Sequence, residues 1–134
     1  MPSSVSPALP AKLKHLTPPE RAALSEFLAR LREHYADEVV SVRLFGSRAR
    51  GEGGPESDLD VLVVVRSEDW RVHWDIVRLA SRVSLDYEVD LSSKVLSQRQ
   101  YRWLGQRHTL FHRNIQAEGV RLWTRPPRPT SAIT

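Results

Sequence analysis

Apolar and polar positions along the chain divide into segments with two different periods. After the stretch TPPE (residues 17–20), apolar residues recur at helical spacing over residues 24–31. Thr17 and Glu20 match a capping box, and proline is tolerated in the first helical turn. The pattern therefore predicts a helix from residue 17 to about residue 35. Apolar residues then alternate with polar ones over residues 40–44, which predicts a strand with one buried face.

The second half of the chain repeats this succession of strand and helix. The run LDVLVVV (residues 59–65) is typical of a central strand that is buried on both faces. Glu68 and Asp69 can open a helix in which Trp70 and Trp74 face inward. The remaining pattern predicts a strand at residues 87–91 (YEVDL), helices at about 97–104 and 109–118, a stop at Gly119, and a short final strand in VRLW (residues 120–123).

These elements predict an α/β (α+β) fold, in which helices pack against a small mixed sheet of three to four strands. We expect a flexible arm over residues 1–16, one folded domain over residues 17–124, and a disordered proline-rich tail over residues 125–134. A chain of 134 residues is long enough for one domain with a core of its own.

Composition narrows the class of protein. Hydrophobic residues make up 40% and charged residues 27%, as in an ordinary soluble domain. The sequence contains no cysteine, which rules out disulfides and thiolate metal sites and suits a cytoplasmic protein. No apolar run approaches the ~20 residues of a membrane helix, and residues 1–16 do not resemble a signal peptide. The net charge is +4, and arginine supplies most of the positive charge. Arginine pairs with carboxylate and phosphate, so the chain could meet nucleic acid, a nucleotide or an acidic partner, but bulk charge alone fits a solvated arginine surface better.

Candidate chemistry lies between the two predicted strands. Gly46-Ser47 follows the first strand directly, and such a pair lets a phosphate approach the backbone closely and receive hydrogen bonds. Asp58 and Asp60 begin the second strand two residues apart, so both side chains point to one face. Paired carboxylates repel each other unless a cation intervenes, and Mg²⁺ takes one or two carboxylates together with substrate phosphates. If the two strands are antiparallel neighbours, both pairs meet at one edge of the sheet.

A third acid follows on the next predicted strand. Asp90 would bring a third carboxylate to the same place if that strand neighbours the strand of Asp58 and Asp60, although Glu88 and Asp86 share its face. Three carboxylates can hold two metal ions about 4 Å apart. Arg48 and Arg50 either add positive charge beside the same phosphate or belong to the surface.

Together these residues form the pattern Gly-Ser-x10-Asp-x-Asp, followed by an acid in VDL (residues 89–91). The chain resembles a minimal nucleotidyltransferase of the DNA polymerase beta superfamily, over roughly residues 20–122. The resemblance implies a polymerase-beta-like fold, nucleotide binding by Gly46, Ser47 and Arg48, and a two-metal Mg²⁺ site held by Asp58, Asp60 and Asp90, which are also the catalytic residues. Asp90 would act as, or orient, the general base for the acceptor hydroxyl.

The small size is similar to that of nucleotidyltransferases paired with a HEPN-domain ribonuclease in toxin–antitoxin modules (type VII). That resemblance implies an antitoxin that forms a hetero-oligomer with the HEPN toxin and transfers AMP from ATP to one of its tyrosines. We expect no association with a membrane, and we do not expect nucleic acid as the direct substrate. Two alternatives remain open: an antitoxin that neutralises its partner by binding alone, and a transferase acting on a small, aminoglycoside-like molecule.

Aromatic and basic residues outside this pattern have two interpretations. Tryptophans at positions 70, 74, 103 and 123 are spaced as expected of core residues, and an exposed one could instead dock a partner. The basic stretch that contains Arg99, Arg102, Arg107 and Arg113 fits a solvated face or a surface for an acidic partner better than a nucleic-acid site.

Overall fold

The computed structural model describes residues 9–54 and 56–124. The elements are, in chain order, the 3-10 helix η1 (Ala11–Leu13), α1 (Pro18–Tyr35), β1 (Val39–Phe45), β2 (Leu59–Val65), α2 (Trp70–Tyr87), β3 (Leu91–Ser97), α3 (Gln98–Gln106), α4 (Leu110–Glu118) and β4 (Val120–Thr124). None of the helices in these described ranges is both long and apolar enough to cross a membrane.

The four strands form one mixed sheet in the order β3-β2-β1-β4. β1 is antiparallel to both β2 and β4, whereas β2 and β3 are parallel. Parallel neighbours need a long crossover, and α2 supplies it. The predicted fold class is confirmed, and the antiparallel pairing of β1 with β2 brings the end of the first strand to the beginning of the second.

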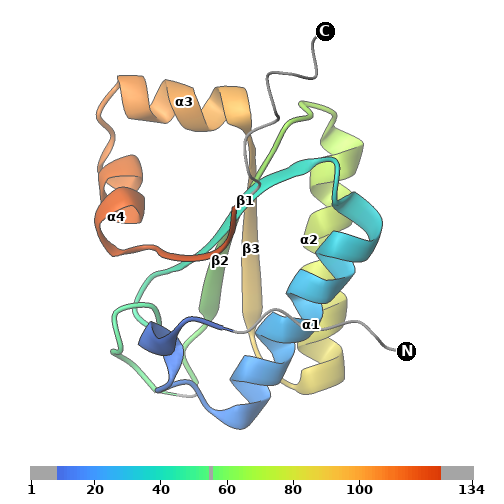
Figure 1. Cartoon of the computed structure of the whole chain (residues 1–134), viewed down its shortest axis with the longest axis vertical. Helices are drawn as coiled ribbons and strands as arrows, with labels where there is room; N and C mark the ends of the chain where they lie inside the picture. The colour runs from blue at the N-terminus through green and yellow to red at the C-terminus, as the bar shows by residue number, and fades with distance from the viewer. Residues whose placement is uncertain (1–8, 55, 125–134) are drawn as a thin grey trace, which may run out of the picture.

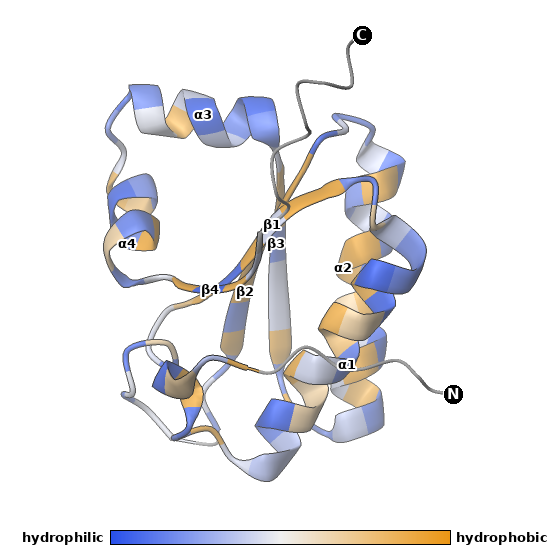
Figure 2. Ribbon diagram, viewed as in Figure 1, coloured by the Kyte–Doolittle hydropathy of each residue, from blue (hydrophilic) through white to orange (hydrophobic). Residues whose placement is uncertain are grey.

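Two hydrophobic clusters hold the helices against the sheet. α1 and α2 cover one face, and α3 and α4 lie on the other side (Figure 1). The larger cluster joins α1 and α2 to alternate residues of β2 such as Val61 and Val63. The smaller one joins Ile115 of α4 to Leu62 and Val64 on the opposite face of the same strand. β2 is therefore buried on both faces, as the run LDVLVVV predicted. Hydrophobic residues gather in the sheet and on the sides of α1 and α2 that face it (Figure 2).

The N-terminus of α1 confirms the predicted capping box. The Thr17 hydroxyl accepts a hydrogen bond from Glu20 N, and the Glu20 carboxylate accepts one from Thr17 N. The segment before it also packs on the core, because Leu13 and Leu16 are buried. The folded part thus includes residues 9–16, which the sequence analysis assigned to a flexible arm, while residues 1–8 and the predicted tail lie outside the described residues.

The predicted strand at residues 87–91 is wrong. α2 continues to Tyr87, Glu88 ends it in the left-handed conformation with φ of 53°, and β3 begins only at Leu91. The Ser84 hydroxyl stabilises this change of direction, because it hydrogen-bonds to both the N–H and the carbonyl of Leu91.

The predicted inward orientation of two tryptophans of α2 is also wrong. Trp70 is 67% exposed and Trp74 is 50% exposed. The buried face of the helix consists instead of Ile76, Ala80 and Val83. Each tryptophan has an arginine of the same helix over its ring, so the indoles lie along the outer surface rather than in the core.

Candidate functional site

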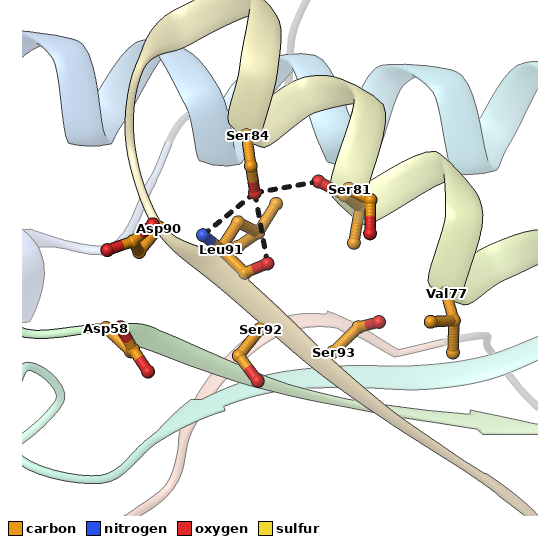
Figure 3. A pocket seen from close by; sticks show the side chains of 9 residues that line it. Asp58, Val77, Ser81, Ser84, Asp90, Leu91, Ser92 and Ser93 are labelled. Atoms are coloured by element: carbon orange, nitrogen blue, oxygen red, sulfur yellow. Dashed lines mark hydrogen bonds between the residues drawn. The ribbon is translucent and has the colours of Figure 1, made fainter.

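Asp58 and Asp90 lie side by side at the edge of the sheet where β2 and β3 begin. Leu59 pairs with Leu91, and Leu59 N donates a 2.8 Å hydrogen bond to the carbonyl of Asp90. Each aspartate therefore immediately precedes one of two paired residues. Both line a pocket of about 280 Å³ that is bounded by β3 and by the C-terminal half of α2 (Figure 3). The expected neighbourhood of these two acids is confirmed, although Asp90 belongs to the turn before β3 and not to the strand itself.

Asp60 is held against the glycine that follows β1. In the antiparallel register Asp60 pairs with Phe45, so the next residue, Gly46, passes beside the Asp60 side chain. A Cβ atom at Gly46 would lie only 2.5 Å from Asp60 Oδ2, and Gly46 has a φ of +79°. Glycine is required at this position for both reasons. The close approach places the candidate phosphate-binding backbone next to a candidate metal ligand.

The segment after Gly46 folds into consecutive hydrogen-bonded turns. Ala49 N and Arg50 N donate to the carbonyl of Gly46, and Glu52 N donates to that of Ser47. The backbone N–H groups of Ser47 and Arg48 have no acceptor among residues 9–54 and 56–124. Successive free amides in a turn form a concave site for an anion, so this segment can bind phosphate oxygens.

Arg48 supports this turn from beneath. Its side chain is buried and forms a bidentate ion pair with Glu20 of α1, through Nε (3.1 Å) and Nη2 (2.6 Å). Its Nη1 donates to the carbonyls of Glu52 and Gly53 at 3.4 and 3.3 Å, and its own carbonyl accepts a 2.6 Å hydrogen bond from His15 Nε2. With protein acceptors on every nitrogen, the guanidinium is better placed to fix the turn than to contact nucleotide, contrary to the contact expected from the sequence.

A family model described as the nucleotidyltransferase domain matches residues 24–114, most of the chain, and this span contains the Gly46-Ser47 pair and all three aspartates. The chain belongs to the nucleotidyltransferase domain family. The resemblance inferred from the sequence is thereby confirmed, and the chain is an enzyme of this class.

Two relatives from Methanocaldococcus jannaschii, both provisionally named protein adenylyltransferases, are similar to this nucleotidyltransferase. One is 33% identical over 101 residues, which is 75% of this chain and 94% of the relative. The other is 37% identical over 70 residues, which is 52% of this chain and 71% of the relative.

Solved structures share the fold. A provisionally assigned nucleotidyltransferase from Sulfolobus solfataricus has a TM-score of 0.52 at 21% identity, covering 80% of this chain and 84% of that one. A chain from a mutant of the toxin–antitoxin MntA-HpeT has a TM-score of 0.51 at 17% identity, covering 76% and 72%. At these identities the likeness concerns the fold alone.

The three aspartates of this nucleotidyltransferase lack a cationic partner among the described residues. Burial, followed by repulsion from Asp58, raises the pKa of the Asp60 carboxyl. The carboxylates of Asp58, Asp60 and Asp90 make no hydrogen bond or ion pair within the part of the chain that the structure describes. A pair of like-charged oxygen ligands fits Mg²⁺, which would take its remaining ligands from water and phosphate.

The predicted cluster of three metal-binding carboxylates is not formed. No group of three histidine, aspartate or glutamate side chains in the described ranges is close enough to hold one ion. Asp90 lies one residue before β3, and not on the strand where the sequence predicted it. Asp58 and Asp60 fit the metal as a pair, and Asp90 flanks them.

Asp86 and Glu88, the other two candidates for the third acid, lie away from Asp58. Asp86 forms an ion pair with Arg30 of α1 at 3.2 Å. Glu88 occupies the left-handed position that ends α2, and it does not line the pocket of Asp58 and Asp90. Asp90 is therefore the best-placed third acid.

Two residues that support the site were not predicted from the sequence to do so. Glu20 was interpreted only as a helix cap, yet the same carboxylate also holds Arg48. His15 was placed in a mobile arm, yet it contacts the carbonyl of Arg48. Arg50, by contrast, stays near the surface, where it pairs with Glu52 and Glu118 beside a small cavity that also borders Gly46.

Proposed function

We propose that this nucleotidyltransferase is a Mg²⁺-dependent protein adenylyltransferase that transfers AMP from ATP to a hydroxyl of a partner toxin and thereby neutralises it. The observation that carries the proposal is the contact of Gly46 with Asp60. It joins a turn with free backbone amides to a pair of unneutralised carboxylates, which is what transfer of a nucleotidyl group requires. The proposal implies a cytoplasmic protein, because ATP and Mg²⁺ are available there.

The residues divide the work of the reaction. The amides of Ser47 and Arg48 and the Ser47 hydroxyl would bind the β- and γ-phosphates of ATP. Asp58 and Asp60 would hold Mg²⁺, which when bound would neutralise charge on the triphosphate. Asp90 lies next to Asp58 and would accept the proton of the attacking hydroxyl. The acceptor oxygen then bonds to the α-phosphorus, the bond from that phosphorus to the bridging oxygen breaks, and pyrophosphate leaves.

Two findings support a protein as the acceptor. The relative that is matched over 94% of its length is provisionally named a protein adenylyltransferase. A chain with the same fold occurs in a toxin–antitoxin crystal structure. We propose a HEPN-domain toxin as the partner and a tyrosine hydroxyl as the acceptor, in keeping with the family resemblance.

Labelled ATP tests this function. The protein is incubated with Mg²⁺, ATP labelled at the α-phosphate, and the proposed HEPN-domain partner. We expect label on the partner, and we expect Asp58→Asn and Asp60→Asn each to remove it. Asp90→Asn should strongly reduce labelling, whereas Glu88→Gln, a matched change two residues away outside the pocket, should not. Full labelling by both Asp58→Asn and Asp60→Asn would refute the mechanism.

The two alternatives give different results in the same assay. An antitoxin that acts by binding alone would protect cells with the Asp58→Asn and Asp60→Asn changes in place and would transfer no label. A small-molecule transferase would consume ATP with small hydroxylated acceptors and leave the partner unlabelled.

A further inference from the structure

α3 is an amphipathic helix that the fold leaves largely uncovered. None of its nine residues is buried: Tyr101, which packs on the smaller core cluster, and Leu104 are half-buried, and Trp103 is exposed. Trp103 is 50% exposed, and Leu110, at the start of α4, is 69% exposed. A tryptophan and a leucine exposed near each other are typical of an interface more than of a solvated face.

The surface beside α3 is hollowed. A cavity of about 410 Å³ lies between α3, the end of β3 and the residue Glu68 before α2. Its apolar lining consists of Leu96, Trp103 and Leu104. Its polar rim consists of Glu68, Arg99 and Gln100. We call this cavity the α3 groove. Its composition matches an apolar anchor site surrounded by polar contacts.

The positive charge of the chain is concentrated in the segment that contains α3. Residues 91–117 contain five lysines and arginines and no aspartate or glutamate, whereas the rest of the chain contains fifteen basic and sixteen acidic residues. The net charge of +4 therefore comes entirely from this segment. Arg99 and Arg102 are exposed on α3 itself, and the Arg99 side chain is 81% exposed. Arg99 pairs with Glu68 across the groove at 3.7 Å, and an acidic partner is complementary to the net charge of the segment.

The form of the aromatic side chains favours protein over nucleic acid. Nucleic-acid surfaces offer open aromatic faces on which bases stack. Here Arg107 lies 4.5 Å from the centre of the Trp103 ring, Lys94 lies over Phe111, and Arg43 lies over Tyr101. These rings already carry cations, while the apolar groove remains open for a side chain.

The groove is far from the proposed catalytic aspartates. Asp90 precedes the first residue of β3, and α3 begins where β3 ends, at the opposite end of a seven-residue strand. At ~3.3 Å per residue this separation is roughly 20 Å. A partner bound at the groove would leave the nucleotide site open.

We propose that the α3 groove docks the partner protein, by receiving an apolar side chain from an acidic surface of that protein. This inference rests on the proposed function only in assuming that a partner protein exists. Docking at the groove would raise the local concentration of the acceptor hydroxyl at the distant aspartates, so changes in the groove should act on binding and on KM for the partner rather than on kcat.

The test measures, by calorimetry, the affinity of the full chain for the proposed HEPN-domain partner. Trp103→Ala removes the groove wall, and the Arg99→Glu/Arg102→Glu double variant reverses the charge. Trp70→Ala is the matched control, since Trp70 is also exposed on a helix beneath an arginine. We expect Trp103→Ala to raise Kd about tenfold or more, as truncation of an interface tryptophan does. The charge reversal should slow association and flatten the salt dependence, while the control stays within about twofold of wild type, as exposed positions outside an interface do. Unchanged melting temperatures would show that the variants are folded.

Each other outcome decides the question. Equal affinities of Trp103→Ala and Trp70→Ala, or no complex with the wild-type chain, would overturn the proposal. It would also be overturned if a mixed-sequence single-stranded RNA bound the wild-type chain and only its affinity, not that of the partner, fell in the variants. If binding is lost selectively but the partner never receives labelled AMP, the docking surface stands and the proposed enzymatic function fails.

Discussion

Replacing Arg48 by methionine should both destabilise the protein and loosen the candidate phosphate-binding turn that follows Gly46. Methionine keeps much of the length of the side chain but removes the charge and every hydrogen bond. Glu20, which is only 2% exposed, would then be a buried carboxylate whose one cationic partner in the described structure is gone. The turn would also lose the two hydrogen bonds that Arg48 donates to the carbonyls of Glu52 and Gly53.

The expected magnitude follows from the burial of the ion pair. Removing one partner of a buried pair costs about 3–5 kcal/mol. For a chain of this length that corresponds to a fall of roughly 10–20 °C in melting temperature. The double variant Glu20→Gln/Arg48→Met should recover part of the loss, because it leaves no unpaired charge in the interior.

Calorimetry at two pH values measures this effect and its electrostatic origin. Burial alone would raise the pKa of Glu20, but hydrogen bonds from Arg48 and Thr17 and the charge of Arg48 outweigh it, and the pKa lies below its ordinary value of 4.5. The stabilisation by the pair is thus present above pH 4.5 and is lost as the pH falls through the lower pKa of the folded state. The difference between wild type and Arg48→Met should shrink accordingly as the solution is acidified.

Arg50→Met is the matched control. Arg50 also pairs with two carboxylates, but at the surface, where ion pairs contribute little to stability. Equal melting temperatures for the two variants would refute the structural role of Arg48. A loss of ATP binding by Arg48→Met without any loss of stability would instead support the direct nucleotide contact that the sequence suggested.

Three further changes test the account at other points. Gly46→Ala should abolish nucleotide transfer and lower the melting temperature, because the new Cβ would meet Asp60 Oδ2 at 2.5 Å on a backbone with φ of +79°. Asp58→Asn should abolish transfer yet raise the free energy of unfolding of the metal-free protein by about 0.5–1 kcal/mol at neutral pH, by relieving repulsion at Asp60. Since the pKa of Asp60 is raised in the folded state, urea unfolding should show the gain shrinking as the pH falls through that raised pKa, with no gain left below the ordinary value of 3.8. Ser84→Ala should cost about 1–3 kcal/mol in the same unfolding assay, because the N–H of Leu91 loses its acceptor at the start of β3.

Local sequence signals predicted most of the fold, and their failure at β3 has a physical cause. The capping box at Thr17 and the apolar run of β2 depend on neighbouring residues, so both were visible in the sequence. β3 is an edge strand whose Ser92 and Lys94 are exposed, so its apolar alternation is weak. The sequence YEVDL just before it alternates better, but its first residue still belongs to α2.

The sequence predicted the site residues that stand at a fixed spacing, but not the contacts between residues that are distant in the chain. Gly46, Asp58 and Asp60 stand at a fixed interval, and the antiparallel pairing of β1 with β2 brings Gly46 next to Asp60. Arg48 and Glu20 are 28 residues apart and sit on different elements. Glu20 already had a complete local explanation as a capping residue, so nothing in the sequence indicated its second role.

The most direct test of the central claim is the intact mass of the proposed HEPN-domain partner after incubation with this protein, ATP and Mg²⁺. We expect a mass increase of one or more adenylate groups, located by peptide fragmentation on a tyrosine hydroxyl, and no increase with Asp58→Asn or Asp60→Asn. An unmodified partner that is nevertheless neutralised, or the same modification with both aspartate variants, would contradict the account.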